Sequence, residues 1–241
     1  MSKGFSFIND VAHRPWPMPS KNWQFYQEWN DVLFLHFEVA YNDLRPLIPD
    51  SIILDSFNDK YYISVVAFKM EHIRPAYLPA VNFISNFHEI NVRTYVKKNN
   101  KTGVYFINIE AAKVLSAFIA KSLSGLPYEK ADIIRDKNAY INLNKQNNCY
   151  LDVTFDVEEK INHKTDLEKW LTERYSLFLI KNKKLHIYEI HHKEWDIYQV
   201  NIKRLDIDYQ FNDLTIAAYQ LIGCQYSPGV QVISWSSDII E

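Results

Sequence analysis

The sequence predicts a mainly β fold, in which an antiparallel sheet closes into a barrel flanked by about three helices. Three observations lead to this prediction. Aromatic residues make up 15% of the 241 residues, and tyrosine and phenylalanine favour strands. About ten or more segments have the length and apolar content of strands, against three with helical periodicity. Hairpin signals join many of these strands, which favours antiparallel pairing and closure.

We expect a single domain over residues 1–241, with residues 1–24 as an extended N-terminal arm that lies on the body of the domain. All-β barrels of this length are common as one unit. The arm contains the segment HRPWPMPSKNW, which is rich in proline and tryptophan. The chain shows no internal repeat, no low-complexity segment and no linker between domains.

The strands follow one another along the chain with turn residues between them. The apolar segment VLFLHFEV (32–39) reads as a buried strand. The next segment, NDLRPLI (42–48), is expected to form a short helical turn capped by Asn42 or Asp43. A hairpin signal lies at residues 58–59. The further strand candidates are 52–57, 61–70, 86–96, 104–111, 130–135, 139–144, 149–157, 175–180, 185–192, 197–205 and 230–235.

Three segments have the apolar spacing of helices. AAKVLSAFIAKSLSG (111–125) is the clearest of them and ends at a glycine. In TDLEKWLTERY (165–175), Thr165 and Glu168 have the spacing of a capping box. FNDLTIAAYQLIG (211–223) is expected to begin at an asparagine cap and to end at a glycine.

The net charge, the two cysteines and the absence of several motifs exclude a number of function classes. The formal net charge is −2 and no basic stripe is present, so we expect no nucleic-acid partner. No window is apolar enough for a membrane span or a signal peptide, so we expect no membrane partner. Cys149 and Cys224 form neither a disulfide framework nor a zinc spacing, which favours a cytoplasmic protein. Phosphate loops, dinucleotide fingerprints and nucleophile elbows are absent, so no cofactor is expected.

The histidines do not predict a metal site. His36 and Glu38 share one strand face, but no third ligand has the required spacing. His36 is therefore either a hydrogen-bonded core residue or part of a cavity lining. His191 and His192 are adjacent on a predicted strand and face opposite ways. His192 and Trp195 could form part of a cavity wall, although we expect them to serve packing.

The stretch NFHEINVRTYV (86–96) is the strongest candidate for a functional site. Side chains alternate along a strand, so its two faces differ in polarity. If it pairs with the following strand, a register that places Arg93 opposite Asn108 or Phe106 keeps polar residues together. From the pattern alone, the polar face is either solvated or lines a cavity. That face carries Glu89, Asn91, Arg93 and Tyr95.

Several motifs give the chain a resemblance to a known family. They occur in the order WPMP, LRPLIPDSIILDSFNDKYYISVVAFKM, NFHEINVRTYV, SGLPY, LTERY and EIHHKEW. With them the chain resembles the uncharacterised YqjF-type bacterial family over nearly its whole length, a family without an assigned activity. The order of the segments is more remotely similar to acetoacetate decarboxylase. This similarity implies a barrel of the acetoacetate decarboxylase-like type, in which the row from Glu89 to Tyr95 lines the interior.

The chain departs from the decarboxylases at the nucleophile. Those enzymes carry a lysine after Gly-x-Pro that attacks a carbonyl and forms a Schiff base. Here the segment reads GLPYE, with Tyr128 at the lysine position and Glu129 next to it. Tyrosine cannot form an imine, and whether Lys130 replaces the lysine stays open. Glu89 matches the glutamate of the decarboxylase site.

Two functions are compatible with these residues. In the first, the cavity binds a small polar or carboxylated molecule, with the carboxylate on Arg93. In the second, the chain is an isomerase, hydratase or lyase without a Schiff base, in which Glu89 is the acid or base and Tyr128 stabilises an oxyanion. The large oligomers of the decarboxylases imply a homo-oligomer as one option. The further ligand-binding candidates are Asn91, Tyr95, Glu110 and His36.

Overall fold

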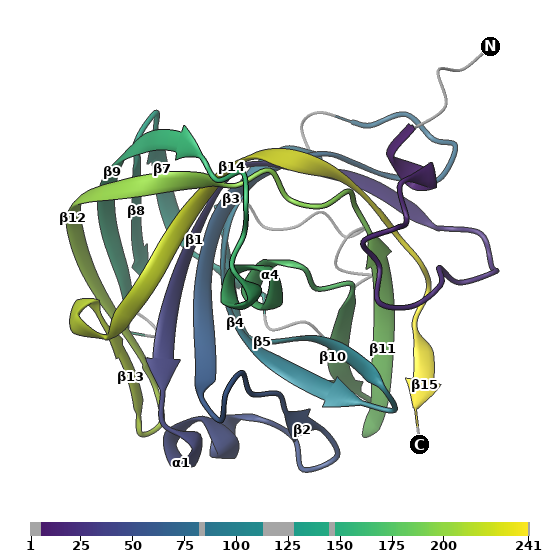
Figure 1. Ribbon diagram of the computed structural model, residues 1–241, viewed down its shortest axis with the longest axis horizontal. Coiled ribbons are helices and arrows are strands. Elements are labelled where there is room, and N and C mark those ends of the chain that lie inside the picture. Colours follow the sequence, from purple (N-terminus) through teal and green to yellow (C-terminus); the bar gives the residue numbers. More distant parts are fainter. Residues whose placement is uncertain (1–5, 82–84, 113–127, 145–147, 241) are drawn as a thin grey trace.

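The computed structural model describes residues 6–81, 85–112, 128–144 and 148–240 (Figure 1). Within these residues the chain is mostly strand, and fifteen strands belong to one sheet. Most neighbouring strands run antiparallel; β5 pairs in parallel with β6 and with β10. The mainly β, mostly antiparallel class predicted from the sequence is confirmed.

Seven strands of the sheet follow a path that returns on itself. Their order is β11-β10-β5-β4-β3-β1-β14, and β11 pairs with β14 as well as with β10. We call these seven strands the ring; in Figure 1 they surround the helix α4. They are β1 (Phe25–Val39), β3 (Tyr61–Pro75), β4 (Phe87–Lys98), β5 (Lys101–Ala111), β10 (Ser176–Lys181), β11 (Lys184–His191) and β14 (Leu221–Ser234).

The sheet continues past the ring from β14 through β12, β9 and β8 to β7. We call these four strands the extension; Figure 1 shows them to the left of the ring. They are β12 (Tyr198–Phe211), β9 (Cys149–Lys160), β8 (Ala139–Asn144) and β7 (Asp132–Asp136). The short strands are β2 (Ile53–Leu54), β6 (Tyr128–Lys130), β13 (Leu214–Ala217) and β15 (Asp238–Ile240).

Strands β1, β3 and β4 are buried on both faces. On one face, Leu35, Val65 and Val92 belong to a core that includes side chains of β9 and β12 from the extension. On the other face, Phe34 and Val66 belong to a second core, inside the ring. Strands covered on both sides read as nearly continuous apolar runs, which explains the composition of 32–39. The second face carries the candidate site.

Two α-helices lie within the described residues. α1 (Tyr41–Leu44) and the 3₁₀ turn η2 (Arg45–Leu47) confirm the expected helical turn, but Ala40 is the N-cap. The helix thus starts directly after β1, so the predicted cap at Asn42 or Asp43 is wrong. α4 (Asp166–Thr172) has the predicted capping box. Neither helix is long and apolar enough to cross a membrane.

The helix expected over 211–223 is wrong. The chain there makes a tight turn at Asn212, whose φ of 51° is left-handed, and returns as β13 beside β12. Leu214 and Ile216 are buried while Thr215 is exposed, which is the two-residue period of a strand. The 3₁₀ turn η3 (Ala218–Gln220) then leads into β14. Of the helix expected over 111–125, Ala111 is the last residue of β5, and residues 113–125 lie outside the described part.

Residues 6–24 lie against the ring. They contain the 3₁₀ turn η1 (Ser6–Asn9), and the rest is irregular up to the start of β1. The indole Nε1 of Trp16 donates a hydrogen bond to Glu189 Oε2 at 2.8 Å, which ties this segment to β11. Figure 1 shows the segment beside β11 and β14.

Candidate functional site

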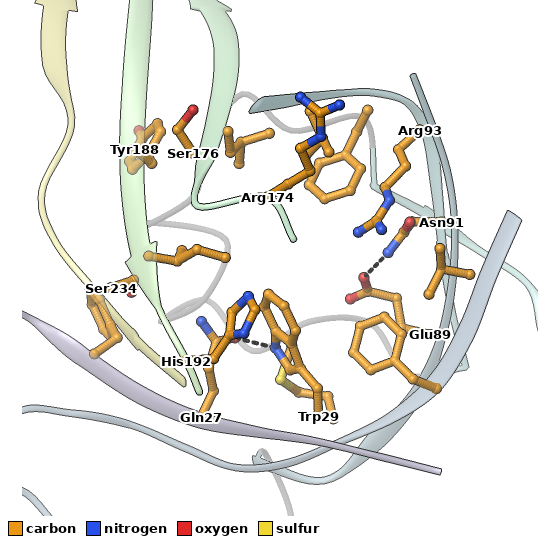
Figure 2. Close-up of a pocket in the computed structure, with 18 of the residues that line it drawn as sticks. Gln27, Trp29, Glu89, Asn91, Arg93, Arg174, Ser176, Tyr188, His192 and Ser234 are labelled. Carbon is orange, nitrogen blue, oxygen red and sulfur yellow. Dashed lines mark hydrogen bonds between the residues drawn. The ribbon is translucent and has the colours of Figure 1, made fainter. Parts of the chain in front are cut away.

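A cavity of about 260 Å³ lies inside the ring. Its walls come from β1, β3, β4, β5, β10 and β11, and from the segments after α4 and after β11. One part of the lining is apolar and aromatic, and a polar group of side chains interrupts it on β4 (Figure 2). A mostly apolar cavity with a few convergent polar groups is the usual form of a small-molecule site. The apolar lining includes Trp29, Val32, Phe34, Val66, Phe68, Met70, Phe87 and Trp195.

The polar group on β4 consists of Glu89, Asn91 and Arg93, three of the four residues of the predicted row. Figure 2 shows the three side chains one after another along one wall of the cavity. β4 is held between β3 and β5, so its alternation fixes which side chains face the interior. Arg93 lies opposite Phe106, one of the two predicted registers, next to a bulge that follows Val92.

Glu89 is buried, with 3% of its surface exposed. Asn91 Nδ2 donates a hydrogen bond of 3.2 Å to Glu89 Oε1. The other amide atom, Asn91 Oδ1, has no hydrogen-bond partner among the described residues. The pair therefore presents a carboxylate and an unused amide oxygen within the cavity wall, and both accept hydrogen bonds.

Arg93 is a buried cation without a carboxylate partner in the described part of the chain. Its Nη2 donates one hydrogen bond of 3.3 Å to the carbonyl of Leu171, and its Nε has no partner among the described residues. The guanidinium lies 5.7 Å from the ring centre of Phe34. A buried charge is costly unless it is paired, so this site favours an anion.

Arg174 also lines the cavity, but its charge is compensated. Its Nη1 forms an ion pair of 2.9 Å with Asp55 Oδ2, and its Nε donates to the carbonyl of Trp170 at 2.7 Å. The guanidinium stacks 4.1 Å from the ring centre of Trp170. Arg174 therefore serves the packing of α4, as its position after the helix suggests.

Tyr95, the fourth residue of the predicted row, is not part of the cavity lining. Its ring is fully buried beside Trp170, with 4.6 Å between ring centres, and its hydroxyl donates to the Leu171 carbonyl at 3.0 Å. The prediction that Tyr95 orients a ligand is corrected: α4 covers this end of β4. Tyr95 holds α4 in place instead.

His36 lies behind the cavity wall, in the core. Its ring contacts Ser64 Oγ at 2.6 Å and Gln225 Oε1 at 2.8 Å. Burial, with the positive charge of Arg93, lowers the pKa of His36 to about 3, so the ring is neutral. Its predicted role in ligand binding is corrected to a core hydrogen bond. Glu38 pairs with Lys60 on the surface, and no cluster of three metal-ligating His, Cys, Asp or Glu residues lies within the described ranges.

Glu110 faces away from the cavity. It is fully buried between β5 and the extension, where Asn142 Nδ2 donates to it at 2.6 Å and the Tyr209 hydroxyl donates at 2.8 Å. Burial raises the pKa of Glu110 above its ordinary value. Its expected place in the cavity lining is therefore wrong. Phe106 of β5 faces the cavity, but the bulge next to it shifts the alternation by one residue, so that Ala111 and not Glu110 lies opposite Glu89.

The segment GLPYE (125–129), where the decarboxylases have their lysine, is described only from the backbone of Tyr128 onward. The backbone of Tyr128 pairs with Ile109 of β5, and its side chain lies outside the described part. Lys130 is exposed and is not among the cavity-lining residues. Glu129 is half-buried and accepts a hydrogen bond from Asn144 at 3.3 Å.

The sequence did not single out Gln27 and Trp29, and for His192 it offered a cavity wall only as the alternative to packing; all three side chains line the cavity. Trp29 Nε1 donates to Gln27 Oε1 at 3.1 Å, and both side chains line the cavity. β1 starts at Phe25, earlier than the predicted strand at 32, and the alternation of residues 25–29 was the available signal. His192 comes from the other side of the ring, so only the fold brings it next to Trp29.

The chain belongs to the family DUF2071, described as an uncharacterized conserved protein. The family model matches residues 26–231. The uncharacterized protein YqjF of Bacillus subtilis (strain 168) is 34% identical over 178 residues, which cover 70% of this chain and 72% of YqjF. These matches confirm the family resemblance seen in the motifs, and they assign no activity.

Solved structures with the same fold are acetoacetate decarboxylase-like. The acetoacetate decarboxylase of Legionella pneumophila has a TM-score of 0.62 at 12% identity, covering 100% of this chain and 98% of its own. An acetoacetate decarboxylase-like enzyme of Sphingomonas wittichii RW1 has a TM-score of 0.56 at 14% identity, covering 95% and 98%. The enduracididine biosynthesis enzyme MppR, complexed with pyruvate, has a TM-score of 0.59 at 8% identity, covering 95% and 93%. At these identities the likeness shows the fold alone.

Proposed function

We propose that this protein binds a small organic acid inside the ring, with the ligand's carboxylate on Arg93. On this proposal the ring is the wall of a barrel of the acetoacetate decarboxylase-like type, and its interior is the binding site. The observation that carries the proposal is the guanidinium of Arg93, which has no carboxylate partner among the described residues and is buried at a cavity of about 260 Å³. The planar guanidinium donates two parallel hydrogen bonds to a carboxylate, which makes this pairing strong and directional.

The volume of the cavity, its apolar lining and its acidic residue limit the size and the charge of the ligand. A volume of about 260 Å³ and a lining rich in phenylalanine and tryptophan suit a molecule with a compact apolar body. Glu89 lies on the same wall and repels a second carboxylate, so a monocarboxylic acid fits better than a diacid. The pyruvate complex of MppR supports a small carboxylic acid as the ligand of this fold.

The proposal requires no Schiff base. The segment GLPYE has Tyr128 where the decarboxylases have their lysine, and Lys130 is exposed outside the cavity lining. Binding through Arg93 uses only groups that the cavity wall presents. A carrier, a sensor or an enzyme of another mechanism would all begin with this binding step.

The test is a titration of the wild type and of Arg93→Met with a panel of small aromatic and aliphatic monocarboxylates. The fluorescence of Trp29 and Trp195, which line the cavity, reports binding. Loss of a charged hydrogen-bonding partner costs about 1.5–3 kcal/mol, so we expect the Kd to rise about tenfold to a hundredfold. The matched control is Arg204→Met, because Arg204 is an exposed arginine of β12. Equal affinity in wild type and Arg93→Met would refute the proposal.

A second function, isomerase, hydratase or lyase chemistry, is favoured by one observation. Glu89 is buried in the cavity wall, and the neutral ring of His192 lies on another wall of the same cavity (Figure 2). Two such groups can move a proton to and from a bound acid. Glu89→Gln keeps the shape of the side chain, so it is expected to leave affinity within about threefold and to abolish turnover. Retained turnover in Glu89→Gln would exclude Glu89 as the acid or base.

A further inference from the structure

The imidazole of His192 is held in one tautomer. Its Nδ1 lies 2.7 Å from the carbonyl oxygen of Lys193, which can only accept a hydrogen bond. Nδ1 therefore carries the proton, and Nε2 presents a lone pair. The ring is 1% exposed and lines the cavity, and Nε2 has no hydrogen-bond partner among the described residues.

The surroundings keep this imidazole neutral and fixed. The rings of Tyr175, Trp195 and Trp29 surround it, with centres 4.8, 5.2 and 6.2 Å from that of His192. Burial lowers the pKa of His192 to about 4, although the nearby carboxylate of Glu173 acts in the opposite direction. Glu173 is itself occupied by Tyr175 and by Lys164. His192 is thus a rigid, neutral acceptor.

We infer that His192 Nε2 accepts a hydrogen bond from a hydroxyl group of the ligand, so that the ligand is a hydroxy carboxylic acid with an apolar body. The inference rests on the proposed function, because it takes Arg93 as the site of the carboxylate. Figure 2 shows Arg93 and His192 on different walls of the cavity, with Trp29 beside His192. The aromatic lining between the two walls accommodates the apolar body.

The chemistry of the acceptor selects the hydroxyl. A carbonyl or a carboxylate would place a second lone pair against Nε2, and that contact is unfavourable. An ammonium group could donate, but it would have to lose its hydration among aromatic rings, which costs more than burying a neutral hydroxyl. A ligand without a donor covers Nε2 and leaves this acceptor unsatisfied, and this makes the site discriminate against acids that lack the hydroxyl.

The experiment compares matched pairs of acids that differ by one hydroxyl. The pairs are 4-hydroxybenzoate with benzoate, 4-hydroxyphenylacetate with phenylacetate, and 3-(4-hydroxyphenyl)propionate with 3-phenylpropionate, so that the span from carboxylate to hydroxyl increases in steps. Calorimetry is carried out on the wild type, on His192→Phe and on His163→Phe. His192→Phe keeps an aromatic ring for stacking and removes Nε2, and His163 is an exposed histidine outside the cavity.

For at least one pair, the wild type and His163→Phe are expected to bind the hydroxy acid about tenfold more tightly than its partner. In His192→Phe this ratio falls to about one, while the affinity for the acid without the hydroxyl stays within about threefold. A ratio near one for every pair in the wild type, or a ratio unchanged in His192→Phe, overturns the inference. If Arg93→Met still weakens both members of a pair, the proposed function survives that failure; if no acid binds the wild type at millimolar concentration, both fail.

A measurement on the wild type covers the case in which His192→Phe does not fold. Nitrogen-15 NMR of histidine-labelled protein reports the tautomer of His192 directly. We expect Nδ1 to be protonated in the free protein, and the Nε2 resonance to shift with the hydroxy acid but not with its partner. A protonated Nε2, or equal shifts with both acids, would contradict the inference.

Discussion

Two buried arginines within electrostatic range of each other differ in their partners. Burial lowers the pKa of Arg174, and the positive charge of Arg93 acts in the same direction. Asp55 compensates Arg174 at 2.9 Å, whereas Arg93 has no carboxylate partner in the described ranges. Arg174 is therefore part of an ion pair within the structure, whereas among the described residues nothing compensates the charge of Arg93.

This difference predicts opposite effects on stability. Arg174→Met leaves buried Asp55 with only its longer contact, 3.3 Å, to the half-exposed Lys97. It is expected to lower the free energy of unfolding by up to about 3–5 kcal/mol. Arg93→Met removes an uncompensated charge and is expected to leave the ligand-free protein equally stable or more stable. Urea denaturation of both variants measures the two changes in the free energy of unfolding. A loss above about 2 kcal/mol for Arg93→Met would mean that Arg93 has a structural partner after all.

His36 predicts how stability depends on pH. Its pKa is lowered from 6.5 to about 3 by burial and by Arg93, so between these values the unfolded chain binds a proton that the folded protein does not. Stability contributed by neutral His36 is therefore complete above pH 6.5 and is lost as the pH falls toward 3, with a slope of up to about 1.4 kcal/mol per pH unit. The difference in unfolding free energy between the wild type and His36→Gln, followed over this range, isolates the effect. A difference independent of pH would contradict it.

At the scale of elements, the pairing of β5 with β10 is needed to complete the ring. These two strands run in parallel, and a Cβ at Gly103 would overlap the backbone oxygen of Ser176. Only glycine fits this approach. The cavity depends on it, because Ser176 and Leu177 of β10 form part of the cavity wall.

Gly103→Ala is accordingly expected to push β10 away from β5. The cost of such overpacking is about 1–3 kcal/mol, and acid binding should weaken with it because the wall moves. Gly223→Ala is the matched control, since the nearest atom to its Cβ would be 3.8 Å away and the substitution should be tolerated. Thermal unfolding of the two variants compares them. Equal melting temperatures would show that the β5–β10 contact is not tight.

Local patterns predicted part of this structure, and contacts between distant segments decided the rest. The alternation in 86–96 and the spacing of Thr165 and Glu168 are local signals, so the two faces of β4 and the capping box were predicted correctly. The helix over 211–223 was predicted wrongly, because the apolar residues of a four-residue strand and of the 3₁₀ turn after it together have the spacing of a helix. Tyr95 lies on the predicted face of β4, but nothing in the neighbouring sequence shows that α4 covers its side chain.

At the scale of the whole molecule, the strands β1, β3 and β4 contribute side chains to two separate interiors. One face of β1, β3 and β4 packs against the extension as an apolar core, and the opposite face lines the cavity within the ring. The rigid core fixes the backbone of β4, and this in turn fixes the direction of Glu89, Asn91 and Arg93. A site built on strands that are held on both sides needs little rearrangement when the ligand enters.

Native mass spectrometry of the purified wild type and of Arg93→Met, with the released small molecules identified, tests the central claim most directly. The account predicts that an organic acid stays bound to the wild type, either co-purified or added from the panel of monocarboxylates, and that Arg93→Met loses it. Equal retention of the acid by both proteins, a bound molecule without a carboxylate, or failure of every added acid to bind the wild type would contradict the account.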